Sequence, residues 1–153
     1  MTSASWLEAF LDESGDRLRR GLVARFGVQI GCEAHADAVA WASEHADELR
    51  AMSSPLGYLF RVGQSSARRY LRWQRHPVEL PPVDSGRDPD VEPGLPGAIA
   101  GLGVEERTAV VLVHCHGWTY VEVAELLEVE VTTVNNYVSR GMTKLRRSLG
   151  VTS

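Results

Sequence analysis

Apolar residues in the last third of the chain recur at helical spacing in two blocks separated by a short polar break. The first block runs from Tyr120 to Leu127, and the second runs from Val134 to Leu149. Residues three and four positions apart share one face of an α-helix, so each block predicts an amphipathic helix. Because residues 128–130 form so short a connection, the two helices must cross steeply. Residues 119–149 therefore predict a helix-turn-helix.

The outer face of the second of these helices carries polar side chains suited to a phosphate-bearing partner. Thr132 and Thr133 are expected to cap the helix, which would place its first N–H groups and the positive end of its dipole at an exposed tip. The polar residues that follow are Asn135, Asn136, Tyr137 and Arg140 on the outer surface, and Lys144, Arg146 and Arg147 in the last turns. A helical hairpin with a solvated face is the alternative interpretation.

Three more helices are predicted in the first half of the chain. Apolar residues from Leu7 to Phe26 indicate a first helix that allows a bend near Gly15 and ends near Gly27. Residues 33–50 indicate a second helix with an apolar stripe that includes Trp41. The Ser-Ser-Pro motif at residues 53–55 marks the start of a third helix, because proline is tolerated in the first helical turn.

The third helix carries a line of basic and hydroxyl side chains, which we call the arginine stripe. Its members recur every three or four residues and are Arg61, Ser65, Arg68, Arg72 and Arg75, widened by Arg69. The aromatic residues Tyr58, Tyr70 and Trp73 lie close by in sequence. Such a mixture suits a surface that holds phosphates while stacking on unpaired bases, although core packing explains the aromatic rings equally well.

An acidic and proline-rich segment separates the two helical regions. Residues 77–94 show neither helical nor strand periodicity and predict a linker between a domain at 1–76 and a domain at 95–153. Residues 104–118 are rich in β-branched side chains, but the Glu105–Glu106 start and the Gly117 stop favour a buried helix. The predicted fold class is therefore all-α, with two small helical domains.

Composition narrows the possible functions without defining one. The 153-residue chain has a net charge of −4, and the acids of the predicted linker account for that deficit, so any DNA contact must rest on local basic faces. The amino-terminal segment is acidic, and no apolar run is long enough to span a membrane, which predicts a cytoplasmic protein without membrane insertion. Cys32 and Cys115 are expected to be ordinary buried residues.

Catalytic and metal chemistry find little support in the sequence. Adjacent residues on a helix point in different directions, so the His114-Cys115-His116 triplet is a poor metal site. No Ser/His/Asp, Cys/His or glycine-rich phosphate constellation can be assembled. We therefore predict a non-enzymatic protein without a cofactor.

The order of these motifs resembles one family of bacterial proteins. The segments LPGAIAGLGVEERTAVVLVHCHGWTYVEVAELL and TVNNYVSRGMTKLRRSL resemble the fourth conserved region of sigma factors of the extracytoplasmic-function (ECF) group. The segment SPLGYLFRVGQSSARRYLRW resembles the helix of the second conserved region that engages the promoter's minus-ten element. The resemblance covers most of the chain, with both regions in the correct order.

This resemblance implies a sigma factor that docks on core RNA polymerase and recognises promoter DNA, with an anti-sigma factor as a further candidate partner. It implies that Thr132, Thr133, Asn135, Asn136, Tyr137 and Arg140, with Lys144 in the following turn, face the minus-thirty-five element. It places Tyr58, Arg61, Ser65, Arg68, Arg69 and Arg72 toward the minus-ten element. The helix that meets the polymerase in this family would here carry Asp37, Trp41, Glu44, His45, Asp47 and Glu48.

Two departures from the family pattern concern the helix-turn-helix. Glu128 stands in the turn where the family usually has glycine, and Asn135 and Tyr137 stand where the recognition helix usually has basic residues. Phosphate attraction is therefore weaker at this helix. The alternative function is a regulator that binds DNA without acting as a polymerase subunit, since TVNNYVSRGMTKL also resembles the effector domain of LuxR-type regulators.

Overall fold

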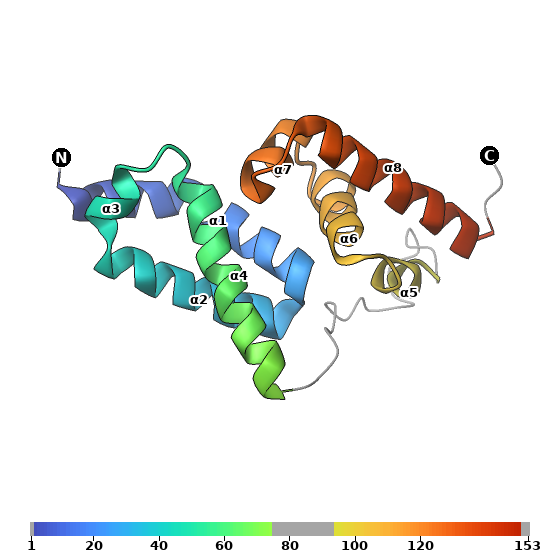
Figure 1. The fold of residues 1–153 in the computed structure, drawn as a ribbon, viewed down its shortest axis with the longest axis horizontal. Coiled ribbons are helices and arrows are strands. Elements are labelled where there is room, and N and C mark those ends of the chain that lie inside the picture. Colours follow the sequence, from blue (N-terminus) through green and yellow to red (C-terminus); the bar gives the residue numbers. More distant parts are fainter. Residues whose placement is uncertain (1, 75–93, 151–153) are drawn as a thin grey trace.

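The computed structural model describes residues 2–74 and 94–150, which are helical apart from short connections and contain no strand. The predicted all-α class is confirmed. Figure 1 shows two groups of helices side by side, with α1 to α4 toward the amino terminus and α5 to α8 toward the carboxyl terminus. Except for Gly94, the predicted linker at 77–94 lies outside the described residues.

The first group begins with two helices that meet at a single residue. Helix α1 (Ser3–Phe26) runs through Gly15 without interruption and ends at Gly27, as its apolar pattern predicted. Helix α2 (Val28–Glu44) starts at once, because Gly27 has a φ of 88° and reverses the chain without a loop. This tight reversal explains why α2 begins five residues before the predicted start at residue 33.

The predicted helix over residues 33–50 is in fact two helices. His45 has φ −128° and ψ 34°, and this non-helical backbone separates α2 from the short α3 (Ala46–Arg50). Helix α4 (Pro55–Gln74) begins at the proline of the Ser-Ser-Pro motif, which confirms that start signal. Helices α1, α2 and α4 pack against one another and form the body of the first group (Figure 1).

The second group contains the helix-turn-helix and the helices that support it. Helix α5 (Leu95–Ala100) precedes α6 (Val104–Val110), which continues into a π-helical segment, η1 (Val111–Cys115). These elements confirm the helix predicted over residues 104–118, although it ends three residues early. Helices α7 (Tyr120–Leu127) and α8 (Val131–Ser148) follow.

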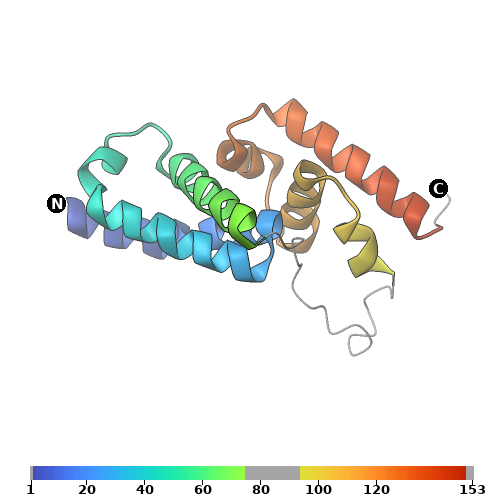
Figure 2. The same cartoon turned by 60° about the horizontal axis from the view of Figure 1, so that its bottom comes forward.

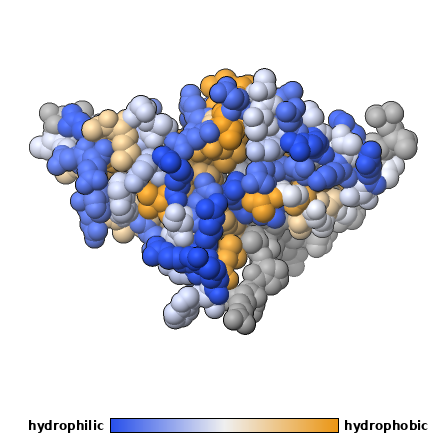
Figure 3. All heavy atoms as spheres, viewed as in Figure 1, coloured by the Kyte–Doolittle hydropathy of each residue, from blue (hydrophilic) through white to orange (hydrophobic). Residues whose placement is uncertain are grey.

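The two groups share one hydrophobic core. Leu18 and Leu22 of α1 and Phe60 of α4 belong to the same buried cluster as Leu112 and Leu126 of the second group. Figures 1 and 2 both place α6 beside the end of α1, and α7 packs against α4. Packing as well as the chain therefore joins the two predicted domains. Figure 3 shows hydrophobic residues in a central band of one face, with hydrophilic residues to either side.

The crossing of α1 and α2 depends on a small residue at position 31. A Cβ added to Gly31 would lie 2.6 Å from Val23 Cα and 2.8 Å from Val23 N, both backbone atoms that cannot move independently. We expect Gly31→Ala to lower the free energy of unfolding by about 1–3 kcal/mol, as overpacking of a core does. Urea unfolding followed by circular dichroism measures this change.

Gly15→Ala is the matched control. A Cβ at position 15 would meet only Leu11 Cβ, at 3.9 Å, so alanine fits there. Since alanine is a better helix former than glycine, the free energy of unfolding should rise by about 0.5–1 kcal/mol. Equal stability changes for the two variants would contradict the close crossing of α1 and α2.

Candidate nucleic-acid interface

The helix-turn-helix is built by caps at both ends of α7. Thr119 and Glu122 form a capping box, in which the Thr119 hydroxyl accepts from the Glu122 N–H and the Glu122 carboxylate accepts from the Thr119 N–H, each at 3.1 Å. Glu128 ends the helix in the left-handed conformation, with φ 55° and ψ 48°. The turn therefore adopts at Glu128 the backbone conformation for which glycine is best suited.

The predicted caps of α8 are wrong. Glu130 is the N-cap residue, and no side chain makes a capping hydrogen bond there. Thr132 and Thr133 lie inside the first helical turn, because α8 already begins at Val131. Thr132 is exposed and Thr133 is half-buried, so only Thr132 lies openly at the tip of the helix.

The remaining residues of the predicted recognition face divide into two kinds. Asn135, Asn136 and Arg140 are exposed on α8. Tyr137 is half-buried and packs against the shared core, so its predicted place on the outer surface is wrong. The guanidinium of Arg140 lies 5.8 Å from the centre of the Tyr137 ring, which positions the arginine beside the two amides.

Lys144 forms an ion pair with a buried residue of the second group. Its ammonium donates to both carboxylate oxygens of Glu106, at 2.7 and 3.0 Å. Glu106 is buried on α6, and the hydrogen bond from Lys144 lowers the pKa of its carboxyl group. Lys144 thus stabilises the packing of α6 against α8.

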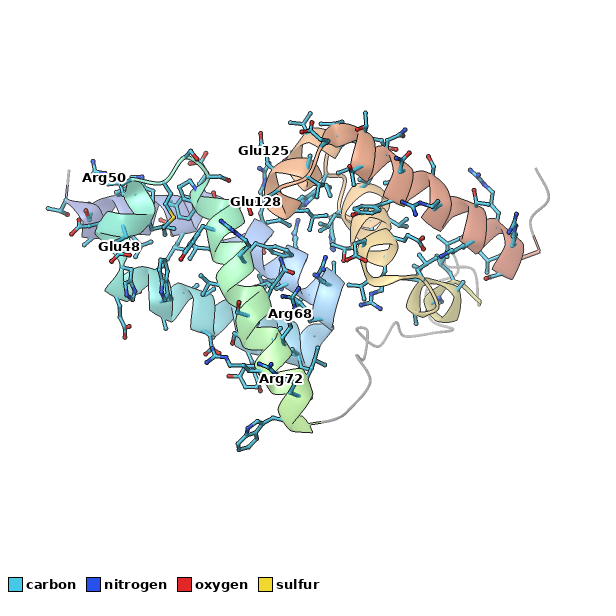
Figure 4. The ribbon with its side chains drawn as sticks, in the orientation of Figure 1. Glu48, Arg50, Arg68, Arg72, Glu125 and Glu128 are labelled. Carbon is cyan, nitrogen blue, oxygen red and sulfur yellow. The ribbon has the colours of Figure 1, made fainter. Side chains whose placement is uncertain are left out.

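The arginine stripe lies on the surface of α4. Arg61, Ser65, Arg68, Arg69 and Arg72 are all exposed, whereas Arg75 lies outside the described residues. Figure 4 shows Arg68 and Arg72 one turn apart along the same side of the helix. These side chains present a basic surface, as the spacing predicted.

The three aromatic residues near the stripe have different environments. Tyr58 is half-buried, with its ring 5.1 Å from that of Trp41, and Tyr70 donates to a carboxylate oxygen of Asp37 at 3.0 Å. That hydrogen bond raises the pKa of Tyr70. Trp73 is 87% exposed and borders a surface pocket that is also lined by Asp37, Ser66, Arg69 and Tyr70. Of the three rings, Trp73 is the one available for stacking.

The predicted polymerase-facing residues also divide by environment. Asp37 accepts hydrogen bonds from Ser66 and Tyr70 and therefore links α2 to α4. Trp41 stacks on His45, with ring centres 4.5 Å apart. The exposed members of the set gather at the corner between α2 and α3: Glu44, Asp47 and Glu48.

Several residues that shape this surface were not singled out from the sequence. Arg107 on α6 is 5% exposed and donates to the carbonyl oxygens of Ala24 at 3.3 Å and Arg25 at 2.6 Å. Arg17 forms an ion pair with Glu122. The Thr119 and Glu122 capping box could have been found as a Thr-x-x-Glu signal, but nothing local marks Arg107 as buried.

The cysteine prediction is wrong, because Cys32 and Cys115 are both exposed. Among the described residues, no three His, Cys, Asp or Glu side chains are grouped in a way that could hold a metal ion. Within residues 2–74 and 94–150, no helix combines the length and the hydropathy that a membrane span requires.

Part of the chain is similar in sequence to known proteins. Residues 95–145 match the sequence family Sigma-70, region 4. Over 105 residues the chain is 31% identical to the RNA polymerase sigma factor CarQ of Myxococcus xanthus, which covers 61% of this chain and 59% of CarQ. The chain thus spans about three fifths of the curated relative it matches.

The fold as a whole also has a counterpart among solved structures. It is similar to a chain in the co-crystal structure of the sigma factor RpoE in complex with the anti-sigma factor NepR from Bartonella quintana. The TM-score is 0.65, the sequence identity is 19%, and the match covers 95% of this chain and 98% of that chain. At this identity the likeness establishes the fold.

The contacts of Asp37 predict a structural effect of its removal. Ser66 is 1% exposed, and Asp37→Ala would leave its buried hydroxyl without this acceptor. We expect the free energy of unfolding to fall by about 1–3 kcal/mol. Glu44→Ala, at an exposed site on the same helix, should change it by less than about 0.5 kcal/mol. Similar values for the two variants would contradict the role assigned to Asp37.

The Glu106 and Lys144 pair predicts a pH dependence of stability. The pKa of Glu106 is lowered in the folded state, so its contribution is present above the unfolded pKa near 4.5 and is lost as pH falls through the lower folded pKa. Glu106→Gln should therefore flatten the decline in unfolding free energy below a pH of about 4.5. Chemical unfolding at a series of pH values tests this, and an unchanged slope would refute it.

Proposed function

We propose that this chain is a divergent sigma factor of the ECF group and that it directs core RNA polymerase to specific promoters. One observation carries the proposal. The region 4 match at residues 95–145 coincides with a helix-turn-helix whose second helix exposes two neighbouring amides, Asn135 and Asn136. Paired amide groups suit the major-groove edge of adenine.

The exposed residues define how each half would act. Asn135, Asn136 and Arg140 would read the minus-thirty-five element as duplex, with Thr132 near the tip. The arginine stripe would hold the phosphates of the minus-ten element, and Trp73 would stack on an unpaired base. The acids Glu44, Asp47 and Glu48 supply an exposed docking surface for the polymerase.

A further protein partner and a cellular location follow from this proposed function. RpoE, whose fold this chain shares, was crystallised with an anti-sigma factor, which supports an anti-sigma factor as a partner here as well. Such a protein works in the cytoplasm, where the polymerase and the chromosome are. Its task is recognition and docking, so no catalytic step by this chain is needed.

The test combines polymerase binding with promoter selection. Purified protein and core RNA polymerase are incubated with a library of duplexes that is randomised across both promoter elements, and initiating sequences are recovered from the transcripts. We expect defined elements to be selected only when the protein is present. Duplex binding without association with polymerase would instead support a conventional helix-turn-helix regulator.

Variants of α8 test the assignment of the recognition face. Asn135→Ala with Asn136→Ala should reduce discrimination at the base pairs they contact by about 1–3 kcal/mol for each lost bidentate contact. Ser139→Ala is the control, because Ser139 is exposed on the same helix and lies outside the predicted set. Unaltered promoter selection by the double variant would remove Asn135 and Asn136 from the site.

Arg140→Ala separates DNA contact from folding better than a change at Lys144. Arg140 is exposed, and its side chain makes a long 3.4 Å hydrogen bond to the Asn136 carbonyl oxygen and contacts the Tyr137 ring. Lys144 also supports Glu106, so its removal affects stability and DNA binding together. We therefore expect Arg140→Ala to lower initiation while leaving urea unfolding nearly unchanged.

A further inference from the structure

A surface pocket lies between α2 and the carboxyl-terminal half of α4. Its volume is about 320 Å³, near the lower end of the range for sites that bind small ligands. Among the described residues, polar and aromatic side chains line it: Asp37, Ser66, Arg69, Tyr70 and Trp73. Figures 1 and 2 show α2 and α4 packed side by side, so the pocket belongs to the half that carries the arginine stripe.

The Asp37 carboxylate is held in place within this pocket. The hydroxyls of Ser66 and Tyr70 both donate to its Oδ2 atom, the Tyr70 hydroxyl at 3.0 Å. Ser66 is 1% exposed, so one of the two donors is fixed by the packing around it. These bonds use two of the roughly four acceptor positions of a carboxylate. Asp37 can therefore still accept hydrogen bonds from the N–H groups of a ligand.

Trp73 supplies an aromatic face at the border of the pocket. It is 87% exposed, whereas Trp118 is buried in the shared core and Trp41 packs against that core. An indole that is so exposed contributes little to the packing of the fold. Its face is available to a planar ligand, and stacking on aromatic side chains is how many proteins hold unpaired bases.

Arginines beside the pocket supply donors for a phosphate. Arg69 lines the pocket, and Arg68 and Arg72 are exposed on the same helix, where Figure 4 shows them one turn apart. A guanidinium donates to phosphate oxygens through a planar set of N–H groups. The carboxylate, the indole and the guanidinium together match three parts of one nucleotide: an amino group on the base, the plane of the base, and the phosphate.

We infer that this pocket binds one nucleotide whose base carries an exocyclic amino group, and that Asp37 selects the base. The amino group of cytosine, adenine or guanine can donate to the carboxylate, whereas thymine has no amino group and presents carbonyl oxygens that repel it. The same chemistry fits an unpaired base of a melted promoter strand and a free nucleotide. The first of these sources rests on the proposed function, and the second does not. In either case Asp37, which the family resemblance assigns to the polymerase, determines ligand specificity.

Binding of short single strands to the purified 153-residue chain tests the inference without polymerase. Fluorescent DNA octamers are compared that are all thymine except for one central cytosine, adenine or guanine, together with the all-thymine strand. We expect each amino-bearing strand to bind at least about five-fold more tightly than the all-thymine strand, the lower end of what one good contact to a base provides. Cytosine against thymine is the decisive pair, because both are pyrimidines of similar size. Equal affinity for these two strands would overturn the inference.

Two variants of the pocket separate base selection from stacking. Asp37→Asn keeps the size of the side chain and an acceptor oxygen, but its amide can also donate to thymine, so the preference for cytosine should disappear. Urea unfolding verifies that this variant is folded. Trp73→Ala should weaken the binding of every strand about 5- to 150-fold, the cost of one lost base stack, and Trp73→Phe should restore most of it. Because Trp73 is exposed, its removal leaves the fold intact. A cytosine preference that survives Asp37→Asn, or unchanged affinity in Trp73→Ala, would count against the pocket.

Titrations with mononucleotides distinguish the two sources of the ligand. If the ligand is a free nucleotide, deoxycytidine monophosphate should bind more tightly than both thymidine monophosphate and deoxycytidine. Arg69→Ala should then remove the advantage that the phosphate gives. Arg146→Ala is the matched control, because it removes the same charge from an exposed site on α8. A cytosine preference seen with the octamers alone identifies the melted strand as the ligand, and no preference in either experiment refutes the site.

Initiation assays separate this inference from the proposed function. If the protein is a sigma factor and the pocket holds a promoter base, Asp37→Asn should change the base selected at one position of the minus-ten element and leave the minus-thirty-five element unchanged. A cytosine preference in binding without any initiation would leave the pocket standing and refute the proposed function. Promoter-specific initiation by a protein that binds all octamers equally would do the reverse.

Discussion

The guanidinium of Arg107 fixes how the two groups of helices meet. Burial lowers the pKa of this side chain and makes its charge costly, so the charge is tolerated only where carbonyl oxygens receive its N–H groups. Those oxygens belong to Ala24 and Arg25, at the end of α1 where the helix dipole is negative. The neighbouring Arg25 is balanced by Glu105 at 3.2 Å. These hydrogen bonds attach α6 to the end of α1, and α7 and α8 follow α6 in the chain.

Most of the fold could be predicted from local patterns because its helices are strongly periodic and clearly punctuated. Gly27, Pro55 and the Thr119 capping residue mark helix ends by local chemistry that acts within a few residues. His45 carries no such signal, and the break between α2 and α3 was missed for that reason. The resemblance to sigma factors supplied the order of the two regions, and the sequence family match at residues 95–145 concerns the second of them.

The candidate site was only partly predictable, because exposure of a side chain depends on contacts that local patterns do not contain. The spacing of the arginine stripe predicted its exposed face correctly. Tyr137 and Asp37 were predicted to lie at a surface, but both contact other helices. Lys144 was expected at DNA and also holds a buried carboxylate. Each of these residues has a partner 29 or more positions away or packs against distant helices, which periodicity cannot show.

The contact between Arg107 and α1 has a consequence during synthesis. Helices α1 and α2 are neighbours in sequence and can pair as soon as they leave the ribosome, whereas Arg107 follows its acceptor Ala24 by 83 residues. At about 5–20 residues per second, roughly 4–17 s pass between the synthesis of the end of α1 and that of Arg107. During that interval Leu18 and Leu22 lack the second half of the core. The chain is therefore most prone to bind chaperones and to aggregate while only its first half has been synthesised.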